Sequence, residues 1–322
     1  MEILKRVPVP TGDICIVQGD LGKLEMLSIG DYGKDVNLKA DFMGLNREPS
    51  PVKHTAMLPL EEKWVVTIST QYSCKSNCSF CSVPKVKQEC RNATFRDLCD
   101  QVLVGLSLHP EVTHTDRLNI HYARMGEPTW NQDVLKSARF FKDYLDPKFK
   151  IHPVVSTMMP KANPDLEDFL YEWMNIKNNV LNGEAGLQIS VNSTDEKARN
   201  KMFRGSQLDL DSISNVLYDI EDPEGRKITL NFALGGWEIN PNVLLQYFDL
   251  RFFLCKLTPL HMTNEVKEKN MMPAGDWTEY TPYAETEQAL KEAGYDTIVF
   301  IASKEEDESK ITCGNAILAD ES

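Results

Sequence analysis

The chain has 322 residues, of which 42% are hydrophobic and 26% are charged, a composition that excludes a disordered or low-complexity protein. Its net charge of −13 argues against a generally basic nucleic-acid-binding protein, because binding to phosphates depends on clustered Lys and Arg. No run of about 18 apolar residues is present, so we expect no membrane-spanning helix. The N-terminal residues lack the apolar stretch of a secretory signal, and we therefore expect a cytoplasmic protein without disulfides.

Residues 1–60 contain short β-like pieces interrupted by Gly, Asp and Pro, which predicts a small β-rich N-terminal extension. From residue 64 onward, apolar strand-like runs alternate with helical patterns. The expected strands cover residues 63–69, 118–122, 151–156, 186–191, 227–233, 252–258 and 296–302. The expected helices cover residues 94–108, 132–144, 165–175, 206–220, 242–248 and 285–293.

Alternating strands and helices predict a parallel sheet with right-handed crossovers. Six such units are too few for a closed eight-fold barrel, so we expect an α/β fold with a partial (β/α)6 TIM-type barrel over residues 61–302. Residues 303–322 would form a C-terminal tail. Ligands of such folds bind at the carboxyl ends of the strands, which makes the residues directly after each strand the candidates for a site.

Three cysteines, Cys74, Cys78 and Cys81, follow the first of these strands on one loop. At this spacing three thiolates can each bind a different iron of a [4Fe-4S] cluster and leave the fourth iron open, as a reaction at the cluster requires. Zinc is the alternative metal. It prefers four closed ligands, and the nearest further candidates, Cys90 and His54, lack the usual finger spacing.

This cysteine arrangement resembles that of the radical S-adenosylmethionine enzymes. The resemblance implies that S-adenosylmethionine binds the open iron and that the reduced cluster cleaves it to a 5′-deoxyadenosyl radical. It also implies a reducing partner such as a flavodoxin or a ferredoxin. In these enzymes the cofactor performs the chemistry, while the barrel positions the substrate and excludes water.

A second motif, Met125-Gly126-Glu127-Pro128, follows the second strand. Its glycine lets the backbone come close to a ligand, and its carboxylate can accept hydrogen bonds from an ammonium group. An ordinary turn is the alternative interpretation. Behind a cysteine loop, this motif looks like the form found in the RlmN/Cfr family, methyltransferases that act on adenine carbons of RNA.

Further segments match that family in the right order. They include Ser156 at the end of the third strand, Ser190 and Asn192 at the fourth, and Cys255-Lys256 on the sixth. The resemblance implies a set of residues that contact S-adenosylmethionine: Gly126, Glu127, Pro128, Ser156, Ser190, Asn192 and His261. The alternative to a ligand contact for His261 is an ordinary loop histidine. The alternative to a functional role for Cys255 is a buried position in the core.

Cys313, in the run Thr312-Cys313-Gly314-Asn315, corresponds to the family's C-terminal catalytic cysteine. In the family this thiol is methylated by one S-adenosylmethionine, and the radical from a second molecule removes a hydrogen atom from that methyl group. The resulting methylene radical adds to the target carbon. The alternative is an incidental thiol. Cys313 is therefore the expected catalytic residue.

Two departures from the family bear on the function. Thr67 stands where the family has a proton-abstracting cysteine, and a hydroxyl is too weakly acidic to replace a thiolate, so another base such as Cys255 or His261 is needed. Residues 1–60 do not match the family's helical RNA-binding region. We therefore keep three hypotheses: methyl transfer to a nucleotide or RNA, hydrogen abstraction from a small metabolite or peptide, and a zinc-stabilised binding module without catalysis.

Overall fold

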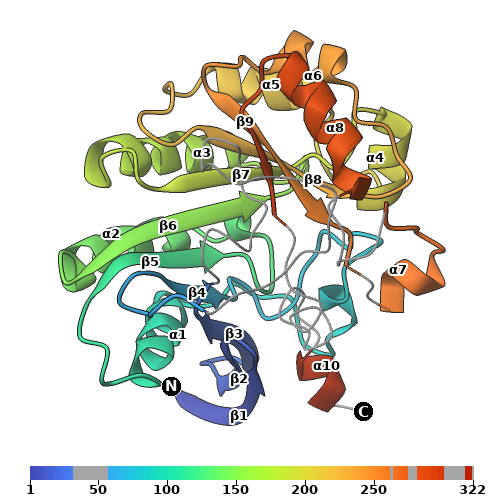
Figure 1. Cartoon of the computed structure of the whole chain (residues 1–322). Helices are drawn as coiled ribbons and strands as arrows, with labels where there is room; N and C mark the ends of the chain where they lie inside the picture. The colour runs from blue at the N-terminus through green and yellow to red at the C-terminus, as the bar shows by residue number, and fades with distance from the viewer. Residues whose placement is uncertain (32–56, 262–263, 275–280, 301–315, 321–322) are drawn as a thin grey trace.

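The computed structural model describes residues 1–31, 57–261, 264–274, 281–300 and 316–320 (Figure 1). Within these residues, ten strands form one sheet whose spatial order follows the chain from β1 to β10. None of the described helices is long and apolar enough to cross a membrane. Figure 1 shows the first three strands at one end of this sheet and the helices arranged around its outside.

The N-terminal part of the sheet is antiparallel. Its strands are β1 (Glu2–Val9), β2 (Gly12–Gln18) and β3 (Lys23–Ile29), and β3 pairs antiparallel with β4 (Trp64–Ile68). The strand-like pieces expected in residues 1–60 are therefore present. They extend the main sheet, so hydrogen bonds run without a break from the N-terminal strands into β4.

The remaining strands are parallel to β4 and to one another. They are β5 (Thr115–Tyr122), β6 (Phe149–Thr157), β7 (Gly186–Ser190), β8 (Ile228–Leu234), β9 (Phe253–Pro259) and β10 (Thr297–Val299). A parallel sheet with sequential strand order and helical crossovers is the architecture of a partial barrel. The expected fold class is confirmed.

Helices alternate with these strands, as the pattern predicts, and one further helix follows the last strand. They are α1 (Phe95–Ser107), α2 (Asp133–Leu145), α3 (Leu166–Asn175), α4 (Glu196–Phe203), α5 (Leu210–Tyr218), α6 (Pro241–Tyr247), α7 (Asn264–Glu268), α8 (Thr281–Glu292) and α10 (Ala316–Asp320). The expectation of one helix over residues 206–220 was wrong at its start. The Asp209 side chain accepts a hydrogen bond from the Ser212 amide, and this cap starts α5 at Leu210.

The two faces of the parallel strands differ in chemistry. The outer face belongs to one large buried core that also contains side chains of the helices, and its strand residues include Val66, Ile120, Val155, Ile189, Leu230 and Leu257. Side chains alternate along a strand, so their neighbours point to the inner face. Those neighbours are largely polar and include Thr67, His121, Ser156, Gln188, Asn231 and Lys256. The fold therefore places polar groups along the inside of the sheet.

Candidate functional site

The loop between β4 and α1 carries Cys74, Cys78 and Cys81, at the carboxyl end of β4. The three thiols are half-buried, and the Cys81 amide donates a 3.1 Å hydrogen bond to the Cys78 carbonyl, which closes a tight turn. The pKa values of the Cys74 and Cys78 thiols are raised, mainly by burial. The negative charge of a Cys74 thiolate raises the pKa of Cys78 further. The two sulfurs are therefore near each other in a poorly solvated place.

Apolar side chains surround this loop on two sides. Cys78 and Phe80 pack against one cluster of buried residues, consisting of Met158, Met202, Phe203, Leu260, Val266 and Met271. The rings of Phe80 and Phe203 meet edge to face with centroids 5.6 Å apart. Cys74 and Cys81 pack against a second cluster, consisting of Ile16, Val83, Val86, Met125 and Ile317. Apolar side chains therefore pack against all three half-buried cysteines.

The three thiols do not converge on a single metal position, since no group of three His, Cys, Asp or Glu side chains within the described residues is arranged to hold one ion. A cubane cluster binds each thiolate through a different iron, so it does not require such convergence. Three cysteines on one apolar-lined loop are a donor set that fits an iron–sulfur cluster. The seven cysteines in the described part of the chain are free thiols.

The turn at Gly126 packs closely against Thr70 and Gln71, in the segment that leads from β4 to Cys74. Gly126 has a φ of +94°, and a Cβ there would lie 2.5 Å from the Cβ of Gln71. The amides of Thr70 and Gln71 donate to the Met125 carbonyl at 2.8 and 3.2 Å, and the Glu127 amide donates to Gln71 Oε1 at 2.9 Å. Glycine is required here both for its backbone conformation and for the close approach.

The carboxylate of Glu127 is buried, with a residue exposure of 4%. It accepts hydrogen bonds from the Thr129 amide at 3.2 Å, from the Thr129 hydroxyl at 2.9 Å and from the Met158 amide at 3.0 Å. Burial raises the pKa of Glu127, and these hydrogen bonds oppose that rise. Its charge also raises the pKa of Cys74 and Cys78, so the carboxylate lies close to the cysteine loop. Pro128 begins a short 3-10 helix directly after it.

The other predicted contacts lie at the carboxyl ends of the next strands. Ser156, near the end of β6, accepts a 3.4 Å hydrogen bond from Gln188 Nε2, and Ser190 is the last residue of β7. Asn192 has a φ of +62°, and its Oδ1 accepts a 3.0 Å hydrogen bond from the Ala233 amide. His261 follows β9 and is half-buried. The topology therefore brings Ser156, Ser190, Asn192 and His261 to the same edge of the sheet as the cysteine loop.

Thr67, at the position of the family's proton-abstracting cysteine, and Cys255, one of its two candidate replacements, lie on opposite faces of the sheet. Thr67 points to the inner face, where its position pairs with His121 on β5. Cys255 lies on the outer face of β9, is fully buried in the core, and burial strongly raises the pKa of its thiol. Cys255 is a core residue, so His261 is the remaining candidate from the sequence.

Cys313 lies outside the described residues, but the helix that follows it is described. Ile317 in α10 is fully buried, and its amide donates a 3.0 Å hydrogen bond to Glu25 Oε2 on β3. Glu25 also forms a buried ion pair with Arg124, two residues before Gly126. The hydrogen bond from Ile317 to Glu25 holds α10 against the sheet beside the cysteine loop. The sequence gives no signal for it, because Glu25, Arg124 and Ile317 are far apart along the chain.

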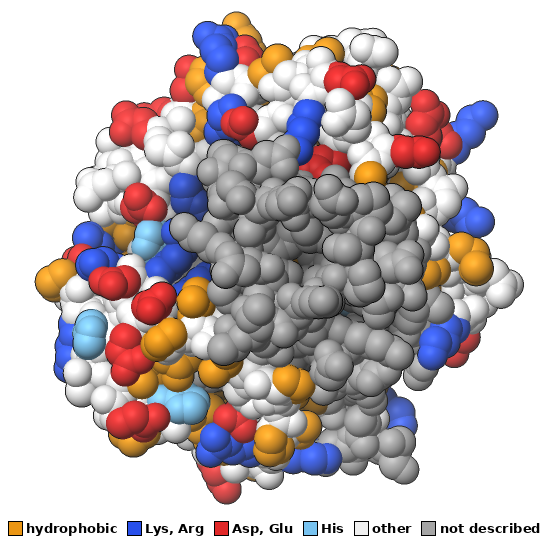
Figure 2. Space-filling view, in the orientation of Figure 1, with side chains coloured by type: hydrophobic (Ala, Val, Ile, Leu, Met, Phe, Trp, Pro, Cys, Tyr) orange, Lys and Arg blue, Asp and Glu red, His pale blue; other side chains and the backbone are white. Residues whose placement is uncertain are grey.

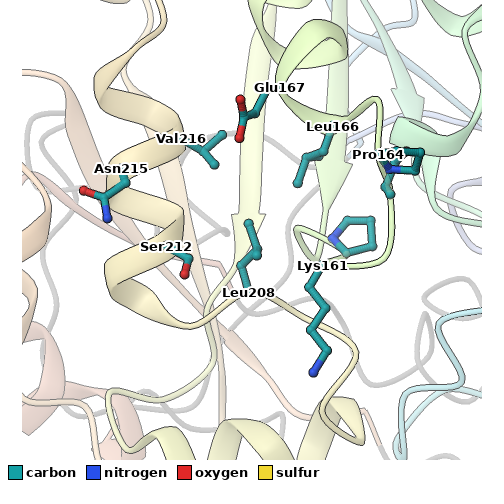
Figure 3. A pocket seen from close by; sticks show the side chains of 10 residues that line it. Lys161, Pro164, Leu166, Glu167, Leu208, Ser212, Asn215 and Val216 are labelled. Atoms are coloured by element: carbon teal, nitrogen blue, oxygen red, sulfur yellow. The ribbon is translucent and has the colours of Figure 1, made fainter.

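The described part of the chain also contains a cavity of about 330 Å³ between the segment after β6 and α5 (Figure 3). Lys161 and Glu167 lie at opposite ends of the group of side chains that line it. None of the residues predicted for the site borders this cavity. It is therefore separate from the cysteine loop, and we assign no chemistry to it.

No protein-family model matches the chain. Among curated proteins, an RlmN RNA methyltransferase of Chlorobaculum tepidum is 28% identical over 62% of this chain and 50% of its own length. The RlmN enzyme of Campylobacter lari is 33% identical over 25% of this chain and 22% of its own length. An RNA methyltransferase of Sorangium cellulosum is 26% identical over 56% of this chain and 42% of its own length.

These matches confirm the resemblance to RlmN proteins that the motifs predict, and they agree with the prediction of an enzyme. The chain spans about half the length of the first of these relatives. One solved structure, Streptococcus suis SuiB bound to the precursor peptide SuiA, aligns with 77% of this chain and 51% of its own, at a TM-score of 0.45 and 13% identity.

Proposed function

We propose that this chain is a radical S-adenosylmethionine enzyme that holds a [4Fe-4S] cluster and methylates a carbon of a nucleotide or RNA through Cys313. The observation that carries the proposal is the loop of Cys74, Cys78 and Cys81, which lies between two apolar clusters with the Glu127 carboxylate beside it. The similarity to RlmN RNA methyltransferases supports the reaction class and the substrate.

The residues of the loop have distinct roles in this proposal. Cys74, Cys78 and Cys81 would bind three irons, and Glu127 would accept hydrogen bonds from the ammonium group of S-adenosylmethionine. Bound there, the reduced cluster and S-adenosylmethionine supply a carbon-centred radical, with an electron from a partner such as a flavodoxin or a ferredoxin. Phe80, packed on Phe203, would exclude water from this radical.

The position of α10 supports the role of Cys313. Ile317 packs in the same apolar cluster as Cys74 and Cys81. Cys313 precedes Ile317 by four residues, and a fully extended chain of that length spans at most about 14 Å. Because Ile317 packs beside Cys74 and Cys81, this short separation along the chain is compatible with a role for Cys313 near the cysteine loop.

A second candidate function is hydrogen abstraction from a small metabolite or a peptide, without methyl transfer. Two observations favour it: the net charge of −13, and the strands β1 to β3 where the RlmN/Cfr pattern has a helical RNA-binding region. In this case Cys313 would donate a hydrogen atom or take no part. A zinc-stabilised binding module is the non-catalytic alternative.

Mass spectrometry of the peptide that contains Cys313 separates these functions. The full chain is reconstituted without oxygen and incubated with S-adenosylmethionine and a reductant. Methyl transfer predicts an added one-carbon unit on Cys313 and none in a Cys313→Ala variant, with Cys99→Ala as a matched control. If the reconstituted protein holds an iron–sulfur cluster but Cys313 never gains a carbon unit, methyl transfer is wrong and hydrogen abstraction is supported. If the protein is colourless and binds zinc, the non-catalytic binding module is supported.

A further inference from the structure

The cysteine loop reaches the surface between its first two thiols. Lys75 and Asn77 are exposed, whereas Ser76 between them is buried, with an exposure of 7%. Lys75 directly follows Cys74, and Asn77 directly precedes Cys78. Each of these two expected iron ligands is therefore bonded to a residue that a partner protein can touch.

The carboxyl end of α4 packs against this exposed stretch. The Met202 carbonyl accepts hydrogen bonds from the Ser79 amide at 2.7 Å and from the Ser79 hydroxyl at 2.8 Å. The Ser206 hydroxyl donates to the Ser76 carbonyl at 3.0 Å. Arg204 ends α4 between these two contacts and is exposed. Its guanidinium is therefore held at the surface beside the cysteine loop.

The helix α7 is attached to the same part of the molecule. Lys85, which follows the last cysteine of the loop, forms an ion pair with Glu265 of α7 at 2.7 Å. Lys267 and Lys269 are exposed on and directly after this helix, and Met272 beyond them is 70% exposed. Figure 1 shows α4 and α7 on the same side of the molecule. Exposed cations thus border the loop from two helices.

These segments have the opposite charge to the chain as a whole. Residues 74–92, 201–206 and 264–272 contain eight Lys and Arg but only three Glu, a net charge of +5 in a chain whose total is −13. Glu89 pairs with Arg91 at 2.5 Å. Glu265 and Glu268 both pair with Lys85, at 2.7 and 3.3 Å. Two of the cations therefore neutralise all three carboxylates.

The other six cations of these segments form no ion pair within the residues that the structure describes; they are Lys75, Lys87, Lys201, Arg204, Lys267 and Lys269. Elsewhere charges of both signs are interspersed, as the described part of one face shows in Figure 2. An excess of one sign at one place on a protein of the other sign attracts a partner of complementary charge.

We propose that the six cations around the cysteine loop form the docking surface for an acidic electron-carrier protein that reduces the cluster. This inference rests on the proposed function, which requires an electron from a partner. One electron leaves the flavin or iron–sulfur group of the carrier, which is oxidised, and enters the cluster, which is reduced; no bond forms or breaks. Transient complexes of this kind are small and depend on charge for their rate of association.

A nucleic acid is the other partner that these cations would attract. The place of the cations favours the carrier. Because the three thiols bind three corners of a cluster from the loop side, the open iron, and with it S-adenosylmethionine and the substrate, would lie on the side away from Lys75. An electron, in contrast, is delivered over the shortest path through the loop that holds the cluster.

Reduction of the cluster by a protein donor tests this surface. The full chain, reconstituted without oxygen, is mixed with a photoreduced acidic flavodoxin, and stopped-flow absorbance gives the rate at which the cluster is reduced. We expect the double variant Lys267→Glu, Lys269→Glu to lower this rate about tenfold at low salt, and added salt to lower the wild-type rate. Arg204→Glu should lower it further, and Arg204→Lys should retain it.

The matched control is Lys136→Glu, an exposed lysine of α2 on the opposite side of the view in Figure 1 from α7, which should retain the wild-type rate. Iron content and 5′-deoxyadenosine formed with dithionite should be unchanged in every variant. Loss of either in the wild type would contradict the proposed function, so the two failures are distinguishable.

Two results would overturn the docking surface. One is a flavodoxin that reduces the wild type no faster than the charge-reversed variants. The other is an unchanged reduction rate in these variants together with weaker binding of a single-stranded RNA oligonucleotide, because the cations would then serve a nucleic acid.

Discussion

Cys255 and Lys256 are neighbours on β9, yet their surroundings are opposite. Cys255 is fully buried in the apolar core under the helices, whereas Lys256 lies on the inner face among polar side chains. The same contrast separates Leu230 from Asn231 on β8 and Ile120 from His121 on β5. The alternation of a strand therefore divides one sheet into a face that stabilises the fold and a face with groups that a ligand can use.

The largest expected difference is between substitutions of a cysteine on the loop and of a cysteine in the core. Cys78→Ala should remove a cluster ligand and abolish bound iron, because two remaining thiols on the loop cannot hold a stable cubane. Cys255→Ala, on the outer face, should retain the iron. Iron content and visible absorbance after reconstitution without oxygen measure both variants. Equal iron in the wild type and Cys78→Ala would contradict the assignment of the loop.

Substitutions of Leu230 and Asn231 compare how much the two faces contribute to the free energy of unfolding. Leu230 is fully buried in the core, so Leu230→Ala should lower the free energy of unfolding by about 2–5 kcal/mol. Asn231→Ala removes an unpaired acceptor from the inner face and should change the free energy of unfolding by about 1 kcal/mol or less in either direction. Urea denaturation measures both. If Asn231→Ala lowers the free energy of unfolding more than Leu230→Ala does, the inner face also stabilises the fold.

The pH dependence of stability tests the burial of His121 and, after it, the effect of the nearby cations. Its folded pKa, about 3, lies below its ordinary value of 6.5, so the unfolded chain binds this proton first as the pH falls. Stability from neutral His121 is therefore fully present well above pH 6.5 and decreases below it, by roughly 3 kcal/mol near pH 4.5. A His121→Gln variant should lose this part of the slope. Identical slopes in both proteins would place His121 in an ordinary environment.

The strands were predictable because their outer faces are apolar and regular. The run expected as a strand over residues 63–69 became β4, Trp64–Ile68, whose residues alternate between the core and the inner face. The cysteine loop and the Gly126 turn were predictable for a different reason, since each is local in sequence. Their chemistry depends on residue type and spacing within a few positions.

Contacts between distant segments were not predictable. The ion pair of Glu25 with Arg124, and its hydrogen bond to Ile317, join three parts of the chain that no spacing rule connects. The link from Lys256 through Gln188 to Ser156 depends on which strands become neighbours and in which register. The strand β1 was also missed, because most of its side chains are exposed and give no hydrophobic pattern.

Formation of 5′-deoxyadenosine tests the central claim most directly. The full chain, reconstituted with iron and sulfide without oxygen, is mixed with S-adenosylmethionine and dithionite, and the nucleoside is measured by chromatography. We expect the wild type to form it and Cys81→Ala to form none. A wild type that binds iron and sulfide but releases no 5′-deoxyadenosine, or a Cys81→Ala variant that releases as much, would contradict the account.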